Sequence, residues 1–315
     1  MDDLIIGVKN QNAYVRFTTE LDKVYKVKHE ESLTWILGIE LKNNGLNQGL
    51  YLEKCLSKFG MQDCKTADVP MSVGQNLYDD TIGNLDSNFP YREAIGSLLY
   101  LSRATRPDIS TAVSICSRFV ENPRQQHVQA VKRIFRYLKE TREFALKIKT
   151  TKEGVKAYVD SDWGGDQKDR KSTSGIIIFY GGCPVMWSSK KQKCVALSTA
   201  EAEYVALAKC IQDVKWISAV LKELGEKLET PVIWEDNQAC ITIASSNGSR
   251  QGTKHIEMRY HFVKDAIKNE EVCLKYIKSE DQVADIMTKP IGRIGLARFR
   301  PALFSGAFGN QSKSA

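Results

Sequence analysis

The chain has 315 residues, 42% of them hydrophobic, so it can bury a full core, and its length is typical of about two domains. Its 45 basic and 38 acidic residues leave a net charge of +7, and its eight cysteines form no C-x-x-C pair, which excludes the common zinc-knuckle and redox motifs. No apolar run reaches membrane-spanning length, and the first residues, MDDLIIGVKN, are acidic where a signal peptide is basic, so we expect a soluble protein of the reducing cytoplasm or nucleus.

The first 90 residues predict short strands, a helix and a linker. Residues 1–8 place Asp2 and Asp3 directly before the apolar, strand-like run LIIGV, and taken alone the two aspartates are typical of a solvated terminus. Residues 31–61 then predict a strand, a turn at N-N-G, a short strand and a helix from about Leu52 to Phe59. A linker rich in Asp, Asn and Gly follows, from roughly Ser72 to Phe89.

Residues 91–144 are helical by their apolar period, with Pro107 and Pro123 marking breaks. From Arg124 to Lys149 the chain carries eight Lys or Arg against two Glu. An apolar stripe there is formed by Val128, Val131, Phe135 and Leu138, and a basic row on another face by Lys132, Arg136 and Lys139. Such a helix can pack inward and present the basic row to a phosphate backbone, although a merely solvated amphipathic helix has the same pattern.

From about Val155 the pattern changes to short strands separated by turn signals. The run KAYVD is a strand ending at Asp160, and SGIIIFYGGCPVMWSS is a hairpin that turns at Gly181 and Gly182. After a long helix, VIWED is a strand ending at Asp236, two helices follow, and VCLKYIKS is the last strand before a short helix, DQVADIMTKP. Three strands, a helix and then alternating strands and helices predict a mixed sheet with helices on both faces.

The long helix begins at Ser198, which forms a capping box with Glu201. Glu203 then lies in line with an apolar stripe that faces inward, formed by Leu207, Ile211, Val214, Leu221 and Leu224. A buried carboxylate is costly unless it is compensated, and a cation is the expected compensation. Three more carboxylates at strand or helix ends could complete an oxygen cage for Mg²⁺, namely Asp160, Asp236 and Asp285. The alternative is that Glu203 reaches past the rim of the helix to water.

The candidate carboxylates have neighbours that could take their place. Asp162 lies on the same face as Asp160 if the strand continues, but the residues that follow indicate that the strand has ended. Alternation directs Glu235 to the face opposite Asp236, and Glu201 is occupied in capping. Asp236 could itself be only the N-cap of the following helix, a role that is compatible with metal binding.

Runs along nearly the whole chain resemble one family. They are L-G-I-E, Y-L-x-K, F-G-M-x-D-C-K and T-R-P-D-I, then Y-V-D-S-D-W, D-R-K-S-T-S-G, A-L-S-T-A-E-A-E-Y, D-N-Q-A, K-H-I-E-M-R-Y-H-F-V and A-D-I-M-T-K-P. In this order they resemble the C-terminal part of a copia-type LTR retrotransposon Pol polyprotein, over residues 1 to about 292. The implied fold class is α/β, a ribonuclease H-like mixed five-stranded sheet with helices on both faces.

The resemblance also implies a domain organisation. A truncated reverse transcriptase palm and thumb remnant would occupy residues 1–72, and a helical connection region residues 73–150. A ribonuclease H domain would occupy residues 151–292, followed by a C-terminal tail at 293–315. The family's polymerase motif Y-x-D-D ends at Asp2 and Asp3, which would be vestigial, because in the family the fingers and the first palm strand lie upstream of Met1. We therefore expect no reverse transcriptase activity from these residues.

The resemblance implies the chemistry as well. The family's metal-binding and catalytic carboxylates fall on Asp160, Glu203, Asp236 and Asp285. They would hold two Mg²⁺ ions, with Mn²⁺ as an alternative, and hydrolyse the RNA strand of an RNA–DNA hybrid. Glu203 would also help to fix the ribose 2′-OH that distinguishes RNA from DNA.

Basic residues near the hairpin are candidate phosphate contacts, in addition to the basic row. They are Arg170, Lys171, Lys190, Lys191 and Lys193. Exposed lysines are common without a ligand, so each is weak evidence by itself. The implied partners are an RNA–DNA hybrid and a complete reverse transcriptase or other Pol products, with no membrane, in a cytoplasmic retroelement particle or in the nucleus.

Two alternatives stay open at this point. Asp160, Asp236 and Glu271 match the spacing of an integrase D-D-E signature, but Glu271 falls between a helix and a strand, whereas the signature needs a glutamate on a helix. The second alternative is a catalytically inactive, truncated retroelement fragment that only binds nucleic acid. The four carboxylates favour activity, whereas the missing palm indicates that the gene copy is no longer autonomous.

Overall fold

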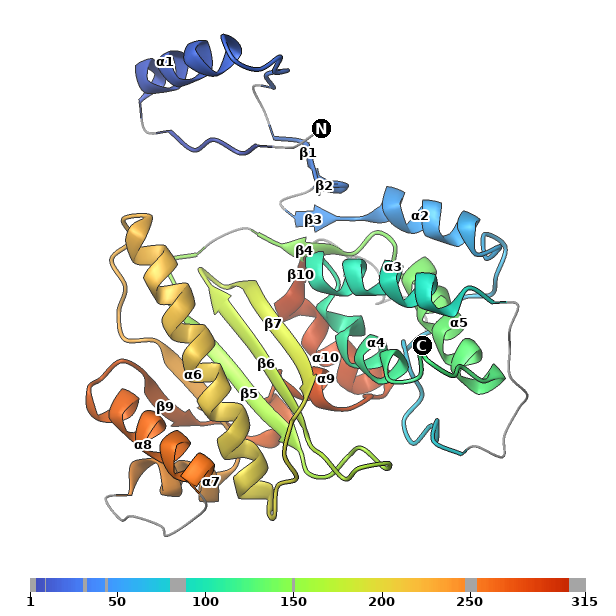
Figure 1. Cartoon of the computed structure of the whole chain (residues 1–315), viewed down its shortest axis with the longest axis vertical. Coiled ribbons are helices and arrows are strands. Elements are labelled where there is room, and N and C mark those ends of the chain that lie inside the picture. The colour runs from blue at the N-terminus through green and yellow to red at the C-terminus, as the bar shows by residue number, and fades with distance from the viewer. Residues whose placement is uncertain are drawn as a thin grey trace, which may run out of the picture.

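The computed structural model describes residues 4–8, 10–30, 33–42, 45–79, 89–148, 151–246 and 254–305 (Figure 1). The expected vestigial polymerase residues Asp2 and Asp3 lie outside the described residues. Within the described ranges the strands form two five-stranded sheets. None of the helices in these ranges combines the length and the apolar character needed to cross a membrane.

The first sheet is antiparallel and joins segments from both ends of the described chain. Its order is β1-β2-β3-β4-β10. The strands are β1 (Trp35–Ile36), β2 (Ile39–Lys42), β3 (Gly45–Asn47), β4 (Ala145–Lys147) and β10 (Phe304–Ser305). Leu146 of β4 pairs with Leu46 on one side and with Phe304 on the other, so one strand from the middle of the chain connects the two ends. β2 and β3 are the strands that the sequence predicts, whereas residues 4–8 form no strand.

Two helices belong to this N-terminal part, α1 (Gln11–Asp22) and α2 (Gly49–Lys58). α2 is the helix expected near Leu52, and it begins slightly earlier. The sequence analysis does not predict α1, and in the structure Thr18 is the buried residue of this helix. Figure 1 shows α1 apart from the rest of the molecule.

Three helices follow where the sequence predicts them: α3 (Tyr91–Ala104), α4 (Ser110–Ser117) and α5 (Gln125–Glu140). The apolar stripe of α5 is buried and shares one core with α3 and α4. The T-R-P-D run between α3 and α4 is structural, because the buried Arg106 donates to the buried Asp108 carboxylate at 2.7 Å. Arg106 also donates to Thr141, and Tyr137 donates to Asp108, so this pair holds the end of α5 in place.

The second sheet is mixed and has the order β7-β6-β5-β8-β9. Its strands are β5 (Lys156–Asp162), β6 (Thr173–Tyr180), β7 (Cys183–Lys191), β8 (Val232–Glu235) and β9 (Cys273–Tyr276). β5, β6 and β7 are antiparallel neighbours, whereas β8 is parallel to both β5 and β9. Gly181 and Gly182 make the predicted hairpin turn with φ angles of 58° and 74°. The expected mixed five-stranded α/β sheet is confirmed.

Helices cover both faces of this sheet, as predicted. α6 (Thr199–Glu223), α7 (Gln238–Ser245) and α8 (Lys254–Lys268) pack on one face, whereas α9 (Asp285–Thr288) and α10 (Arg293–Leu303) pack on the other. Figure 1 shows α6 running obliquely across the strands. Alternate side chains of β6 divide between the two cores, with Ile176 and Ile178 toward α6 and Ile177 toward α9. Phe299 and Leu303 of α10 are buried against the α9 face, so the described part of the tail belongs to the fold.

Three element boundaries differ from those expected. β5 continues through Asp162, because this residue still pairs with Thr173 of β6. Leu224 does not belong to the inward stripe of α6, since it follows the helix as its C-cap and is 69% exposed. The final short helix, α9, is a single turn that begins at Asp285, after a 3₁₀ turn at Ser279–Asp281.

Candidate metal centre

Three carboxylates from different elements converge at one end of the mixed sheet. Asp160 lies in β5, and Asp236 directly follows the parallel strand β8. Tyr158 pairs with Trp234 in these strands, so the two aspartates, each two residues further on, occupy equivalent positions. Glu203 comes from the N-terminal part of α6, and one oxygen from each of the three carboxylates lies within 4.8 Å of the others. The structure therefore brings Asp160, Glu203 and Asp236 together.

Glu203 is buried where a negative charge is hard to hold. Glu203 is only 6% exposed. The alternative, in which its side chain reaches past the rim of the helix to water, is therefore wrong. Its Oε2 has no hydrogen-bond partner among the described residues. Burial raises the pKa of Glu203 well above its ordinary value, and the charges of Glu235, Asp160 and Asp236 raise it further. A divalent cation among these oxygens would compensate both the burial and the repulsion.

Asp285 joins the centre through Asp160. It is the first residue of α9, and its carboxylate pairs with Lys289 at 2.9 Å. Burial raises the pKa of Asp160, and the charge of Asp285 raises it further, whereas a hydrogen bond from the Thr288 hydroxyl lowers it. Asp285 is thus a neighbour of Asp160 but does not belong to the set of oxygens that meet within 4.8 Å.

Glu235 also belongs to the acidic cluster formed around Asp160, Glu203 and Asp236. Strand alternation leaves it out of the predicted site. It is fully buried at 0% exposure, its Oε1 accepts from the Asn237 N–H at 3.0 Å, and its Oε2 has no partner among the described residues. Alternation does place Glu235 on the face opposite Trp234, which is the face that it shares with Ile233. Helix α6 packs on that face and carries Glu203, so the two glutamates lie close enough for their charges to interact. The missed signal is that the helix glutamate and this strand glutamate point into the same core.

The other neighbouring acids are accounted for by local contacts. Asp162 accepts a hydrogen bond from the Thr173 N–H, and burial raises its pKa to about 6. Glu201 accepts from the Leu197 N–H at 2.8 Å, and so completes the cap. The N-cap of α7 is Asn237, which accepts from the Cys240 N–H, so Asp236 does not have that role. Glu271 forms an exposed ion pair with Lys215 at 2.7 Å, and the integrase alternative therefore gains no support.

A glycine sets how closely α9 approaches the sheet. Gly175 lies opposite Asp160 in the β5–β6 pair, and a Cβ added there would come within 2.6 Å of Thr288 Cγ2 and 2.8 Å of Met287 Cβ. Thr288 bonds to Asp160, and α9 begins at Asp285. The glycine of D-R-K-S-T-S-G therefore allows α9 to hold its polar side chains against Asp160.

Gly175→Ala is expected to lower the free energy of unfolding by about 2 kcal/mol, because α9 must move away from β6 to make room for the methyl group. Urea denaturation would measure the change. Gly96→Ala is the matched control, since Gly96 lies in α3 with nothing within 4 Å of an added Cβ, and alanine should be neutral or stabilising there. Equal stability of the Gly175 variant and the unmodified chain would contradict the proposed role of this close contact.

Comparisons with known proteins decide the family. No family model matches the chain. It is 33% identical over 306 residues to the retrovirus-related Pol polyprotein from transposon TNT 1-94 of Nicotiana tabacum. The matched region covers 93% of this chain and 23% of that protein. It is 31% identical over 221 residues to the putative transposon Ty5-1 protein of Saccharomyces cerevisiae, covering 68% of this chain and 72% of that protein. The chain belongs to the retrovirus-related Pol polyproteins of copia/Ty1-type transposons.

The expected membership in the copia-type Pol family is thereby confirmed. The chain spans less than a quarter of the length of the first Pol polyproteins that it matches, at 23% and 21%. Among solved structures, it is similar to the foamy viral protease-reverse transcriptase in complex with an RNA/DNA hybrid. That similarity has a TM-score of 0.45 and 12% identity, and it covers 87% of this chain and 34% of that chain.

In this copia/Ty1-type Pol chain, the basic residues near the hairpin differ in their availability. Lys191 is occupied, because its ammonium pairs with Asp166 at 2.9 Å and with Asp169 at 3.0 Å. Lys171 also lies 3.5 Å from Asp169. The side chains that are exposed and in no ion pair within the described ranges are Arg170, Lys190 and Lys193.

The basic row of α5 is divided among three environments. Lys139 donates to the carbonyl oxygens of Gln62 and Cys64, at 2.6 and 2.8 Å. Lys132 lies over the ring of Phe89, 5.1 Å from its centroid. Arg136 lines a polar cavity. The helical period places these three side chains together, but contacts with segments distant in sequence already engage Lys132 and Lys139.

Proposed function

We propose that this chain is a divalent-metal-dependent ribonuclease that hydrolyses the RNA strand of RNA–DNA hybrids. The observation that carries the proposal is the convergence of Asp160, Glu203 and Asp236, whose oxygens lie within 4.8 Å of one another on a mixed five-stranded sheet. Membership of the copia/Ty1-type Pol family supports it. Residues 151–292 would be the ribonuclease H domain, residues 73–150 the connection region, and residues 1–72 the end of a reverse transcriptase palm and thumb.

The donor set fits a hard divalent cation. All of its ligands are carboxylate oxygens, which suits Mg²⁺ or Mn²⁺, and Glu203 Oε2 is a buried acceptor without a partner among the described residues. When bound, such ions would activate the attacking water and stabilise the leaving 3′ oxygen. Asp160, Glu203 and Asp236 would hold the first ion, and Asp285 would complete the site for a second beside Asp160.

The remaining polar groups would orient this centre and its substrate. Thr288 holds the Asp160 carboxylate through its hydroxyl, and Lys289 holds Asp285 at 2.9 Å. Glu203 would accept a hydrogen bond from the ribose 2′-OH, which selects the RNA strand. Exposed Lys190 and Lys193, at the end of β7 and just beyond it, would contact backbone phosphates. A complete reverse transcriptase or other Pol products would be partners of the chain.

The test is cleavage of a hybrid whose RNA strand carries the label. Purified chain with Mg²⁺ is expected to cut that strand, leave the DNA strand intact, and yield 5′-phosphate and 3′-hydroxyl ends. Chelation of the metal should stop the reaction, because the carboxylates then repel one another and no ion activates water. Hybrid binding without cleavage by the unmodified chain would reject the proposal and favour the inactive nucleic-acid-binding fragment.

A further inference from the structure

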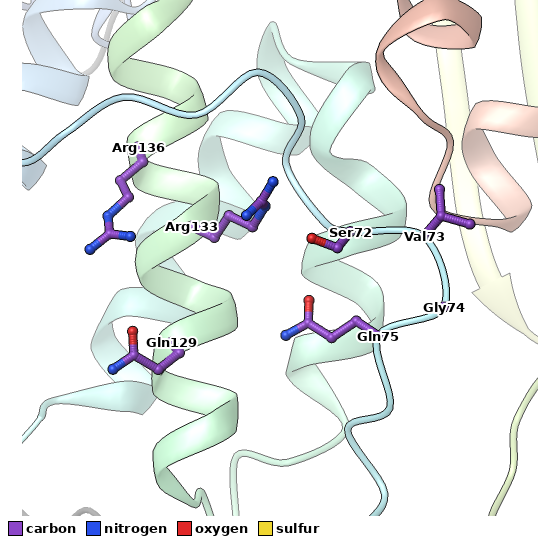
Figure 2. A pocket seen from close by; sticks show the side chains of 7 residues that line it. All are labelled: Ser72, Val73, Gly74, Gln75, Gln129, Arg133 and Arg136. Carbon is purple, nitrogen blue, oxygen red and sulfur yellow. The ribbon is translucent and has the colours of Figure 1, made fainter.

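A polar cavity lies between α5 and the loop that leads into the linker. Its volume is about 350 Å³. The lining residues are Ser72, Val73, Gly74, Gln75, Gln129, Arg133 and Arg136 (Figure 2). Figure 2 shows Arg133 extending from α5 toward Ser72, with Gln75 pointing back toward the helix, and Arg136 and Gln129 also extending from α5. The cavity is large enough for a phosphate group with part of its sugar.

The two arginines of this cavity have no counter-charge. Arg133 and Arg136 form no ion pair within the described part of the chain, and no carboxylate lines the cavity. The Nε atom of each is buried without a hydrogen-bond partner among the described residues. A half-buried guanidinium group without a counter-charge is unfavourable, and an anion in the cavity would supply that charge. Lys132 and Lys139 of the same helix differ, since an aromatic ring and two carbonyl oxygens already engage them.

The rest of the lining offers neutral donors suited to the same ligand. The Ser72 hydroxyl and the side-chain amides of Gln75 and Gln129 can each donate to a phosphate oxygen. Gly74 has a φ of +72°, and nothing lies within 4 Å of an added Cβ, so the loop turns here without a side chain that would fill the space. A guanidinium group can donate two parallel hydrogen bonds to two oxygens of one phosphate, so these arginines favour phosphate over a monatomic anion.

The position of the loop relates the cavity to the carboxylate centre. Pro70 and Met71, which directly precede Ser72, line a small space together with Lys289. Lys289 pairs with Asp285 at 2.9 Å. One short run of chain therefore connects the surroundings of Lys289 to the arginine cavity.

We propose that this cavity is a phosphate-binding subsite in which Arg133, with Arg136, Ser72 and Gln75, holds a backbone phosphate of the nucleic acid. The inference rests on the proposed function, since it takes the hybrid as the source of the phosphate. The same chemistry would accept a free phosphate group, but the closeness of the loop to Lys289 favours a phosphate of the polymer.

The test is the salt dependence of hybrid binding by full-length variants. Arg133→Gln combined with Arg136→Gln is expected to weaken binding roughly tenfold and to reduce the slope of log affinity against log salt by about 1 to 2, since each lost phosphate contact removes about one released counterion. Fluorescence anisotropy of a labelled hybrid at several KCl concentrations measures both quantities. Arg103→Gln is the control, because it removes one charge from an exposed position of α3. Arg133→Lys should retain the slope but bind more weakly, since lysine keeps the charge and loses the paired contact.

Each outcome decides the assignment separately from the proposed function. A slope in the double variant equal to that of the unmodified chain, with cleavage retained, would overturn the subsite and leave the ribonuclease intact. The double variant could instead lose the binding of inorganic phosphate, measured by calorimetry, without any change in hybrid binding. That result would assign the cavity to a free phosphate and would also overturn the nucleic-acid subsite. No hybrid binding by the unmodified chain would overturn both proposals.

Discussion

Asp160→Asn and Asp236→Asn are each expected to lower the rate of hybrid cleavage by about 1,000-fold or more, which corresponds to about 4 kcal/mol of transition-state stabilisation. The amide keeps the shape of the side chain but loses the charge that a divalent ion needs. Both residues contribute to the set of oxygens that lie within 4.8 Å of one another. Single-turnover cleavage of a labelled hybrid measures the rate, and anisotropy should show hybrid affinity changed by less than about threefold.

Asp265→Asn is the matched control for these variants. Asp265 is exposed on α8, so its amide variant should cleave at the rate of the unmodified chain. Near-normal cleavage by Asp160→Asn would show that the converging carboxylates are not the reactive centre. Loss of hybrid binding together with cleavage would instead show that the aspartate contributes to the structure of the binding surface.

The metal-free chain is expected to lose stability as the pH rises, and Glu203→Gln should reduce this loss. Burial and neighbouring charges raise the pKa of Glu203 above its ordinary value of 4.5, so above that pH the folded chain keeps a proton that the unfolded chain has released. The contribution of Glu203 to the free energy of unfolding is therefore most favourable below about pH 4.5. It falls as the pH rises, by up to about 1.4 kcal/mol per pH unit. The glutamine variant should be more stable at pH 8 by about 3 kcal/mol without metal.

Urea denaturation between pH 5 and 8.5, in EDTA and in Mg²⁺, measures this effect. Mg²⁺ should stabilise the unmodified chain more at pH 8 than at pH 6, because the ion replaces a proton that is costly to retain at high pH, and at 100 times its dissociation constant it adds about 2.7 kcal/mol. Glu223→Gln, exposed at the end of the same helix, should leave the pH dependence unchanged. If Glu203→Gln kept the pH slope of the unmodified chain, Glu203 would not be the group whose charge the fold resists.

The sequence predicts the parts of the site that depend on regular local patterns. The hairpin at Gly181 and Gly182 and the position of Asp236 directly after β8 follow from alternation and turn chemistry, and both are observed, whereas β5 runs two residues beyond Asp160. Glu203 follows from the helical period of α6. Those patterns repeat within a few residues, so they can be read without knowledge of the tertiary fold.

The features that the sequence does not predict depend on contacts between distant segments. Glu235 belongs to the acidic cluster because α6 packs over β8, which alternation along β8 alone does not reveal. Lys191 is neutralised by Asp166, a residue 25 positions earlier. Arg133 has the helical position of a solvated residue, and only the loop at 72–75 turns it into part of a cavity.

The pairing of β4 with β10 has a consequence for the order in which the protein can fold during synthesis. Leu146 is translated long before its neighbour Phe304, so the edge of β4 stays open until almost the whole described chain has left the ribosome. Until then the strand edge at 145–146 and the face later covered by Phe299 are exposed to other chains, and nascent copies are expected to need chaperone protection at that stage.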